Sequence, residues 1–251
     1  MRYRIDSASS EVSALVDRFL RPWAAALADR AGEPNLRLRI EKEGDEFRLF
    51  VNDNFRASAE RPELLIPESI RNLDDAVLHR LSGMWAVHAG VVQWRDRALL
   101  LPGGSHAGKS TLVVELLRRG ATYFSDEYAL LDREGRVHPY PRPLLVRNGS
   151  PVQHPFLAEE FGASTGTRPA PLGWIVSLTW QPQEAWNVAP IPQSTALVDL
   201  LRNTPHILEE TPDLIPVLER AVAGARCFAG SRPDAQSAVD SILELIDDRA
   251  A

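Results

Sequence analysis

The stretch ALLLPGGSHAGKSTLVVELLRRGATYFSDEY, residues 98–128, decides the fold of the chain. It contains a glycine, four further residues and then Gly-Lys-Ser, which is the pattern of a phosphate-binding loop. The apolar run 98–101 before this pattern predicts a buried strand, and apolar residues at helical spacing follow it as far as Gly120. A strand, a glycine-rich turn and a helix N-terminus present N–H groups and the positive end of a dipole to an anion. The stretch therefore predicts a nucleotide phosphate site.

The same pattern names the residues that would bind the nucleotide. Lys109 adds a mobile positive charge for the phosphates, and Ser110 offers a hydroxyl to a magnesium ion. ATP and Mg²⁺ are therefore the expected cofactors. The residues expected to bind the nucleotide are Gly103, Gly104, Ser105, His106, Ala107, Gly108, Lys109, Ser110 and Thr111.

An acidic pair follows the predicted helix. Residues 121–125 indicate a second short strand that ends in Asp126 and Glu127. A strand–helix–strand unit would bring this strand back beside the first, with both carboxyl ends at one edge of the sheet. Acidic residues at a strand end often only cap the next turn, but beside phosphates they favour a site for magnesium or for a transferable proton. We therefore expect Asp126 and Glu127 to be catalytic, and Ser110 and Asp126 to bind magnesium.

Residues 85–131 resemble the HPr kinase/phosphorylase family, whose fold is related to that of phosphoenolpyruvate carboxykinase. In that family the phosphate loop is followed, after one short helix, by a strand that ends in an acidic pair, as in SDE at 125–127. A strand of His-Gly type precedes the loop, as in VHAGVV at 87–92, and the intervening stretch has a similar length.

The resemblance implies a kinase whose catalytic residues are Asp126, Lys109, His88 and Glu127. Asp126 would accept the proton of the acceptor hydroxyl, and His88 would orient or partly neutralise Asp126. The chain departs from the family at His106, where glycine is usual, and at Glu127, which replaces a second aspartate. It also lacks the family's glycine-rich C-terminal signature, so the resemblance implies kinase activity and leaves phosphorylase activity open.

The predicted fold class is α/β with some α+β character. It is a mixed central β-sheet with a P-loop strand–helix–strand unit, similar to phosphoenolpyruvate carboxykinase and to the C-terminal domain of HPr kinase. We expect residues 1–84 to form an N-terminal β-hairpin and helix elaboration, and residues 85–251 to form the HPr kinase-like domain.

Hydrophobic periodicity predicts the other elements. Alternation predicts a hairpin that turns at 43–45, and a third strand through Phe55. The predicted helices are 11–30 with a kink near Pro22, 67–82, 194–201, 208–225 and one that begins at Pro233; the predicted strands are 85–94, 173–180, 226–229 and a hairpin over 129–137.

Composition limits the classes of partner. The chain has 251 residues, of which 44% are hydrophobic and 25% charged, as in globular proteins. The net charge of -6 disfavours a nucleic-acid partner. Cys227 is the single cysteine, which excludes a disulfide framework. We find no apolar signal segment or membrane span, and therefore expect a cytoplasmic protein without a membrane partner.

The sequence analysis predicts a kinase that acts on a hydroxyl group of a protein, peptide or small molecule. Two alternatives stay open: a P-loop ATPase in which Asp126 holds magnesium and Glu127 activates water, and an ATP-sensing regulator without turnover. Arg142 and Arg147 are candidates for a clamp on the transferred phosphoryl group. Residues 148–171 are a candidate lid or acceptor-binding loop, and a homo-oligomer is compatible with the sequence.

Overall fold

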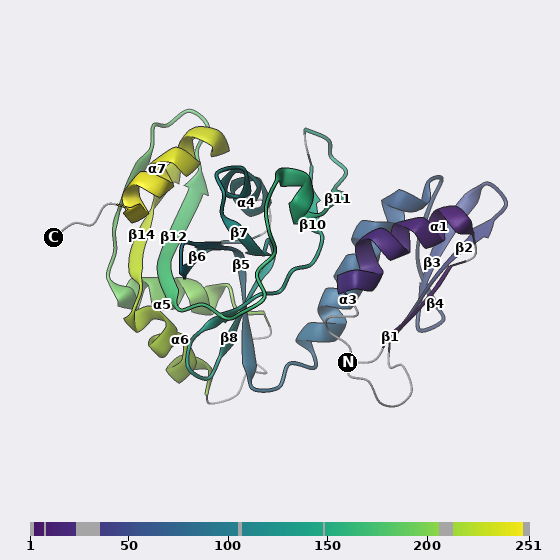
Figure 1. Ribbon diagram of the computed structural model, residues 1–251, viewed down its shortest axis with the longest axis horizontal. Helices are drawn as coiled ribbons and strands as arrows, with labels where there is room; N and C mark the ends of the chain where they lie inside the picture. The colour runs from purple at the N-terminus through teal and green to yellow at the C-terminus, as the bar shows by residue number, and fades with distance from the viewer. Residues whose placement is uncertain are drawn as a thin grey trace. The chain divides into compact units, whose positions relative to one another are not determined.

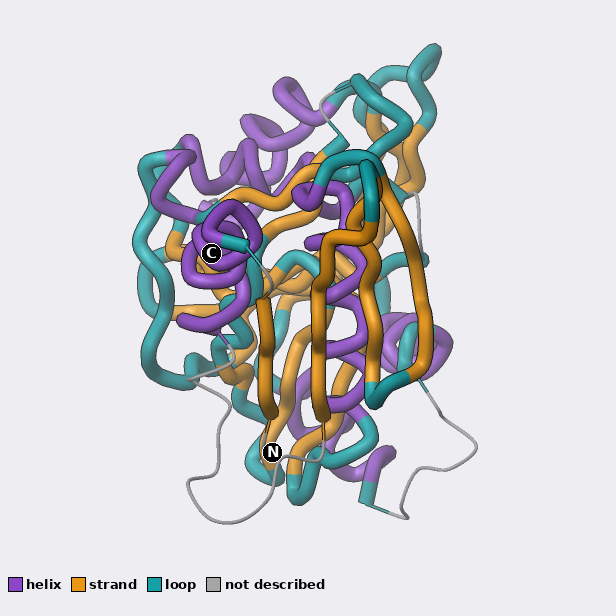
Figure 2. The backbone as a smooth tube through the Cα atoms, turned by 90° about the vertical axis from the view of Figure 1, so that its right-hand side faces the viewer, coloured by secondary structure: helices purple, strands orange, loops and turns teal. Residues whose placement is uncertain are grey.

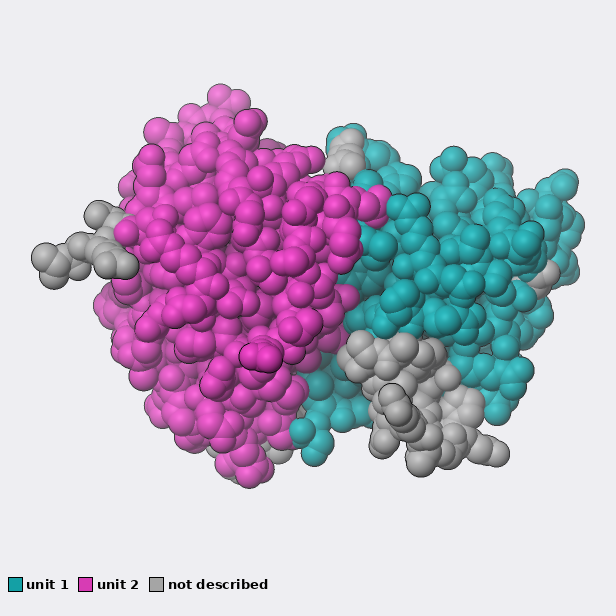
Figure 3. Space-filling model, in the orientation of Figure 1, with its two compact units in different colours: residues 1–82, 142–157 teal, residues 83–141, 158–251 magenta. Residues whose placement is uncertain are grey.

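The computed structural model describes residues 3–7, 9–23, 36–104, 107–147, 149–205 and 213–247 of the chain. The chain divides into two compact units (Figure 3). The first comprises residues 1–82 and 142–157, and the second comprises residues 83–141 and 158–251. Sequence patterns predict a boundary after residue 84, with residues 142–157 in the second domain. In the structure that segment belongs to the first unit.

The first unit contains a four-stranded sheet, whose strands lie side by side in Figure 2. Alternate residues of its two central strands are buried, and the hairpin and third strand predicted here are confirmed. The strand order is β1 (Tyr3–Ser7), β2 (Leu36–Glu43), β3 (Glu46–Val51) and β4 (Asn54–Ala59), with β1 parallel to β2 and the other pairs antiparallel. A short antiparallel pair, β10 (Leu144–Val146) and β11 (His154–Phe156), belongs to the same unit.

Helical segments pack against this sheet. The segment predicted over 11–30 changes from α-helix to π-helix before Pro22, where Arg21 N–H bonds to the carbonyl of Val16, five residues back. Pro22 itself has no N–H to continue an α-helix, which accounts for a distortion here. The part of this prediction beyond residue 23 lies outside the described residues. The helical segments are α1 (Ser10–Leu15), η1 (Val16–Leu20), η2 (Pro62–Leu65) and α3 (Ile66–Leu78).

The second unit contains a mixed sheet, so the chain is a mixed α/β protein. The strand order is β13-β14-β12-β6-β5-β8-β9, and β7 also pairs with β5. β12 is parallel to both β6 and β14, whereas the other pairs are antiparallel. The strands are β5 (Met84–Trp94), β6 (Arg97–Pro102), β7 (Thr122–Ser125), β8 (Tyr128–Asp132), β9 (Val137–His138), β12 (Leu172–Trp180), β13 (Asn187–Pro190) and β14 (Arg226–Arg232).

Helices cover both faces of this sheet (Figure 1). α4 packs with α7 on one face, and α5 packs with α6 on the other. The helix predicted over 208–225 is confirmed from Leu214 onward, and residues 208–212 lie outside the described residues. The segments are α4 (Lys109–Arg118), η3 (Ala158–Phe161), α5 (Gln193–Arg202), α6 (Leu214–Ala223) and α7 (Ala235–Asp247). Among the described helices, none has both the length and the apolar composition that a membrane span requires.

One prediction about the sheet is wrong. β7 does not lie beside β6, because β5 lies between them and pairs with both. The two-residue turn at Arg95 and Asp96, with Arg95 in the left-handed conformation at φ 55°, folds β6 back directly onto β5 and occupies the expected place. β6 and β7 still run in the same direction, since both are antiparallel to β5. Their carboxyl ends therefore still meet at one edge of the sheet.

Candidate functional site

A glycine-rich loop, residues 103–108, joins β6 to α4. Gly108 is the N-cap of α4 and has φ 77°, a left-handed conformation that favours glycine. The N–H groups of the first turn of α4 have no partner within the helix and can bind an anion. Lys109 is only 8% exposed, and its Nζ donates a hydrogen bond to the Gly104 carbonyl at 3.0 Å. The predicted binding residues Ser105 and His106 lie outside the described residues.

The first turn of α4 is linked directly to the acidic pair. Ser110 Oγ donates a hydrogen bond to Asp126 Oδ2 at 3.0 Å. Tyr123 OH donates to Asp126 Oδ1 at 3.2 Å, and the Asp126 residue is fully buried. The two residues predicted to bind magnesium therefore meet, and both oxygens of Asp126 accept hydrogen bonds. Sequence reasoning missed Tyr123, because a tyrosine in a predicted strand carries no signal for this contact.

Asp126 and Glu127 form a break between two strands that pair in succession with β5. β7 pairs with the part of β5 around Val91, and β8 pairs with the part that ends at His88. The sequence predicts that the acidic pair ends a strand before a turn. In the structure, the chain instead continues past the pair as β8, which also pairs with β5. The break is held by Ser125, which is fully buried and was missed. Its Oγ accepts hydrogen bonds from the N–H groups of Glu127 at 3.2 Å and Tyr128 at 3.0 Å.

His88 pairs with the second acid of the pair. Its Nε2 lies 2.9 Å from Glu127 Oε1, at ion-pair distance but without the alignment of a hydrogen bond. The sequence analysis expected Asp126 as the partner of His88, so this part of the prediction is wrong. Asp126 faces Ser110 and Tyr123 instead. The site thus has a buried carboxylate beside the helix and a partly exposed carboxylate beside an imidazole.

The surroundings of Gly90 explain why the His-Gly strand has a glycine at this position. A Cβ atom at Gly90 would lie 2.8 Å from Val113 Cγ2 and 3.5 Å from Lys109 Cβ. The absence of a side chain therefore lets the first turns of α4 approach β5 closely. This approach sets the distance between the glycine-rich loop and the strand that carries His88.

A second cation, Arg232, lies against the loop. Arg232 ends β14 and is 3% exposed, and its Nη2 donates to the Ala107 carbonyl at 3.1 Å. A Cβ atom at Gly108 would collide with this Nη2. The sequence analysis missed Arg232, because no motif connects it with a loop 125 residues earlier.

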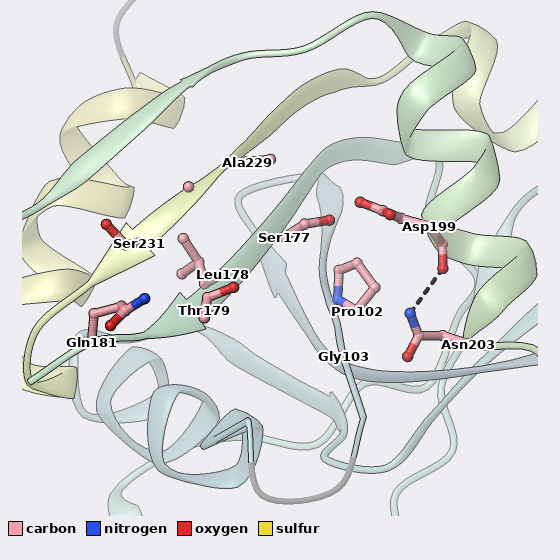
Figure 4. A pocket seen from close by; sticks show the side chains of 11 residues that line it. Pro102, Gly103, Ser177, Leu178, Thr179, Gln181, Asp199, Asn203, Ala229 and Ser231 are labelled. Carbon is pink, nitrogen blue, oxygen red and sulfur yellow. Dashed lines mark hydrogen bonds between the residues drawn. The ribbon is translucent and has the colours of Figure 1, made fainter.

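A cavity of about 450 Å³ adjoins the loop at Gly103. It lies at the carboxyl ends of β6, β12 and β14 and is bounded on one side by α5, which contributes Asp199 (Figure 4). Its wall is partly polar and partly apolar, and the Ser177 Oγ is buried without a hydrogen-bond partner among the described residues. This volume is in the range of small-ligand sites. The lining residues are Pro102, Gly103, Ser177, Leu178, Thr179, Gln181, Asp199, Asn203, Ala229, Gly230 and Ser231.

Buried charge concentrates around the loop. Lys109, Asp126 and Arg232 account for three of the five charged residues among the buried residues of the described chain. The other two, Asp74 and Arg142, form a buried ion pair of 3.4 Å within the first unit. Arg142 is thus committed to the core of that unit, which does not support the predicted phosphoryl clamp, and Arg147 is an exposed residue of the same unit.

The predicted lid is partly tied to the second unit. Within residues 148–171, Ser164 and Gly166 bond through their main chains to Tyr123, and Ala170 bonds in the same way to Val137. The segment also contains η3, and its first part contributes β11 to the first unit. Its second part is therefore a fixed border of β7 and β9.

The donor set fits a magnesium ion that also binds phosphate. In the described part of the chain, no three His, Cys, Asp or Glu side chains converge as a metal cluster would require. Mg²⁺ commonly uses one or two protein oxygens and takes its other ligands from phosphates and water. Ser110 Oγ and Asp126 Oδ2, 3.0 Å apart, match such a partial set.

Comparison with protein-family models gives no match, and comparison with curated proteins gives no significant match. The function therefore has to be inferred from the geometry and chemistry of the residues described above.

Proposed function

We propose that the chain is an ATP- and Mg²⁺-dependent kinase that transfers the γ-phosphate to a hydroxyl group, foremost a serine-type hydroxyl of a protein or peptide. The observation that carries the proposal is the hydrogen bond from Ser110, in the first turn of α4, to the buried Asp126. It joins an anion-binding helix end to a carboxylate. A buried carboxylate beside an anion site is unfavourable unless a cation lies between the two charges.

The chain's own groups divide the work of binding. The N–H groups of the glycine-rich loop and of the first turn of α4 bind phosphate oxygens, and Lys109 neutralises charge that develops on the β- and γ-phosphates. Ser110 and Asp126 would hold Mg²⁺, which would supply positive charge to offset the charge of the phosphates. Tyr123 keeps the Asp126 carboxylate turned toward Ser110 by its hydrogen bond.

Proton transfer falls to Glu127 with His88. Both oxygens of Asp126 already accept hydrogen bonds, whereas the Glu127 side chain is 31% exposed and can meet an acceptor. The acceptor oxygen forms a bond to the γ-phosphorus, the bond from that phosphorus to the β–γ bridging oxygen breaks, and the hydroxyl proton passes to the Glu127 carboxylate. His88 holds that carboxylate in place from 2.9 Å. These contacts favour Glu127 over Asp126 as the base.

The acceptor class comes from the resemblance to the HPr kinase family, whose members act on a serine hydroxyl. The cavity beside Gly103 also has room for a small-molecule alcohol, so the acceptor screen must include both classes.

One observation favours a second candidate, a P-loop ATPase. A carboxylate that an acceptor can reach is also within reach of water, and Glu127 is 31% exposed. In that case Glu127 would activate water and the products would be ADP and phosphate without a phosphorylated acceptor.

A radiolabelled γ-phosphate separates these functions. Purified protein is incubated with labelled ATP and Mg²⁺, with and without a library of serine peptides and small alcohols, and label is followed in acceptor and in free phosphate. The kinase proposal expects acceptor-dependent label that disappears with EDTA. Free phosphate released at the same rate with and without every acceptor would support the ATPase, and nucleotide binding without turnover would support a regulator.

A further inference from the structure

Arg232 is a buried cation behind the glycine-rich loop. Besides the bond to the Ala107 carbonyl, its Nη1 donates to the Pro233 carbonyl at 3.1 Å. Its Nε is buried and has no hydrogen-bond partner in the described part of the chain. Among the described residues, no carboxylate lies within ion-pair distance of the guanidinium, and Asp234 acts on it only through its electric field.

This placement is unfavourable for a guanidinium that serves only packing. Burial lowers the pKa of Arg232 from its usual value, and the Asp234 carboxylate opposes that shift. An apolar side chain of similar length would fill the same space without the cost of removing a charge from water. An arginine here therefore needs a negative partner that the described residues do not supply.

The loop is built around this guanidinium. Gly108 has no Cβ atom, and a Cβ there would collide with Arg232 Nη2. A trans peptide directs its C=O and the following N–H to opposite sides. Because Arg232 holds the Ala107 carbonyl, the N–H of Gly108 points away from Arg232, toward the other side of the loop.

We propose that Arg232 is a positioning residue of a polyphosphate site, which orients the Gly108 N–H and supplies positive potential through the loop from behind. This inference rests on the proposed function, because the polyphosphate is the triphosphate chain of the nucleotide. The charge acts across the thickness of one main-chain segment, away from bulk water. Its removal is expected to weaken triphosphate binding about tenfold or more.

The test compares Arg232→Met, Arg232→Lys and the control Arg226→Met. Arg226 lies at the other end of β14 and is exposed, so its replacement removes the same charge from the same strand. The melting temperature of each protein is measured alone and with Mg²⁺-tripolyphosphate, MgATP or adenosine, and dissociation constants are measured by calorimetry. For Arg232→Met we expect an unchanged or raised melting temperature without ligand, and a loss of affinity of about tenfold or more for tripolyphosphate and ATP. Arg232→Lys should recover part of that affinity, and Arg226→Met should behave as the parent protein.

Each other outcome is decisive. A lower melting temperature of ligand-free Arg232→Met with unchanged ligand affinity would show a purely structural arginine and overturn the inference alone. Equal loss of affinity in Arg226→Met would show a general charge effect and also overturn it. If the parent protein binds neither ATP nor tripolyphosphate, the proposed function and this inference both fail. Tripolyphosphate binding that depends on Arg232, without any phosphoryl transfer, would support the inference and refute the kinase.

Discussion

Glu127 Oε1 lies 2.9 Å from His88 Nε2, whereas Asp126, the neighbouring residue in the sequence, accepts its hydrogen bonds from Ser110 and Tyr123. Two carboxylates that a sequence motif treats as a pair thus have different partners. Substitutions of Asp126 and of Glu127 should therefore have different effects on the reaction.

Glu127→Gln should abolish transfer to the acceptor while nucleotide binding is kept, because the amide cannot take the hydroxyl proton. The expected loss in single-turnover rate is about 10²–10⁴-fold. Asp126→Asn should instead weaken Mg²⁺ binding, so that the variant needs more Mg²⁺ and its activity is partly restored at high Mg²⁺. Rapid-quench kinetics with labelled ATP measure both, and Glu134→Gln, an exposed residue of the β8–β9 turn, is the charge control. If Asp126→Asn is inactive at all Mg²⁺ concentrations and Glu127→Gln is active, Asp126 is the base.

Lys109→Ala should reduce phosphoryl transfer by at least about 10²-fold, because a cation that faces developing phosphate charge is lost. The fold should change little, since the ammonium donates its hydrogen bond to a carbonyl of the loop. Alanine also has a high intrinsic helix propensity. Circular dichroism and urea unfolding check the fold, and an active variant would refute the assignment of the loop.

Ser125→Ala should lower the free energy of unfolding by about 1–3 kcal/mol, because the N–H groups of Glu127 and Tyr128 lose their common acceptor. The acidic pair should also lose its orientation, so that transfer slows in the folded protein. Ser150→Ala is the matched control, since Ser150 Oγ accepts from the Val152 N–H in the same way at an exposed turn. Equal effects on stability in the two variants would contradict a special role of the buried serine.

Gly90→Ala should destabilise the protein by about 1–3 kcal/mol through overpacking, because the new methyl group would lie 2.8 Å from Val113 Cγ2. Val113→Ala removes that Cγ2 atom. The double variant should therefore be more stable than the sum of the single changes predicts. Urea unfolding of all four proteins measures the coupling, and strictly additive changes would mean that Gly90 is required for another reason.

Arg142→Met should cost about 3–5 kcal/mol of stability, because it breaks the buried ion pair between Arg142 and the Asp74 carboxylate. The folded fraction should still bind nucleotide and transfer phosphate normally. Replacing both residues with apolar ones should recover most of the stability. A folded Arg142→Met protein with a large defect in transfer would restore the clamp hypothesis.

Much of the fold was predictable where a pattern repeats along the chain. Alternation predicted the hairpin of β2 and β3, and apolar spacing predicted α4 and α7. β10 and β11 were missed because each has three residues, too few for a period to show. The sequence also could not predict that residues 142–157 belong to the first unit, because this depends on contacts such as the ion pair between Arg142 and Asp74.

The candidate site, too, was predictable only in part. A fixed local spacing, as in the loop and the acidic pair, can be read from one sequence, and the contact of Ser110 with Asp126 follows from it. The partner of His88 depends on which strand of the sheet lies beside β5, and the motif does not contain that information. Arg232 reaches the loop from the end of β14, and only the folded chain reveals this contact.

Two residues of β5 have separate roles, and both roles depend on the face of the strand on which the residue lies. His88 and Gly90 are two apart, so they share one face of the strand. One supports Glu127 and the other makes room for α4. Inserting a single residue between them would turn one of the two to the opposite face, whereas inserting two would keep both faces but lengthen the strand by almost 7 Å, about two residues' rise. The separation between Glu127 and the glycine-rich loop is thus set in whole steps of the β-strand repeat, and cannot be tuned continuously by substitution.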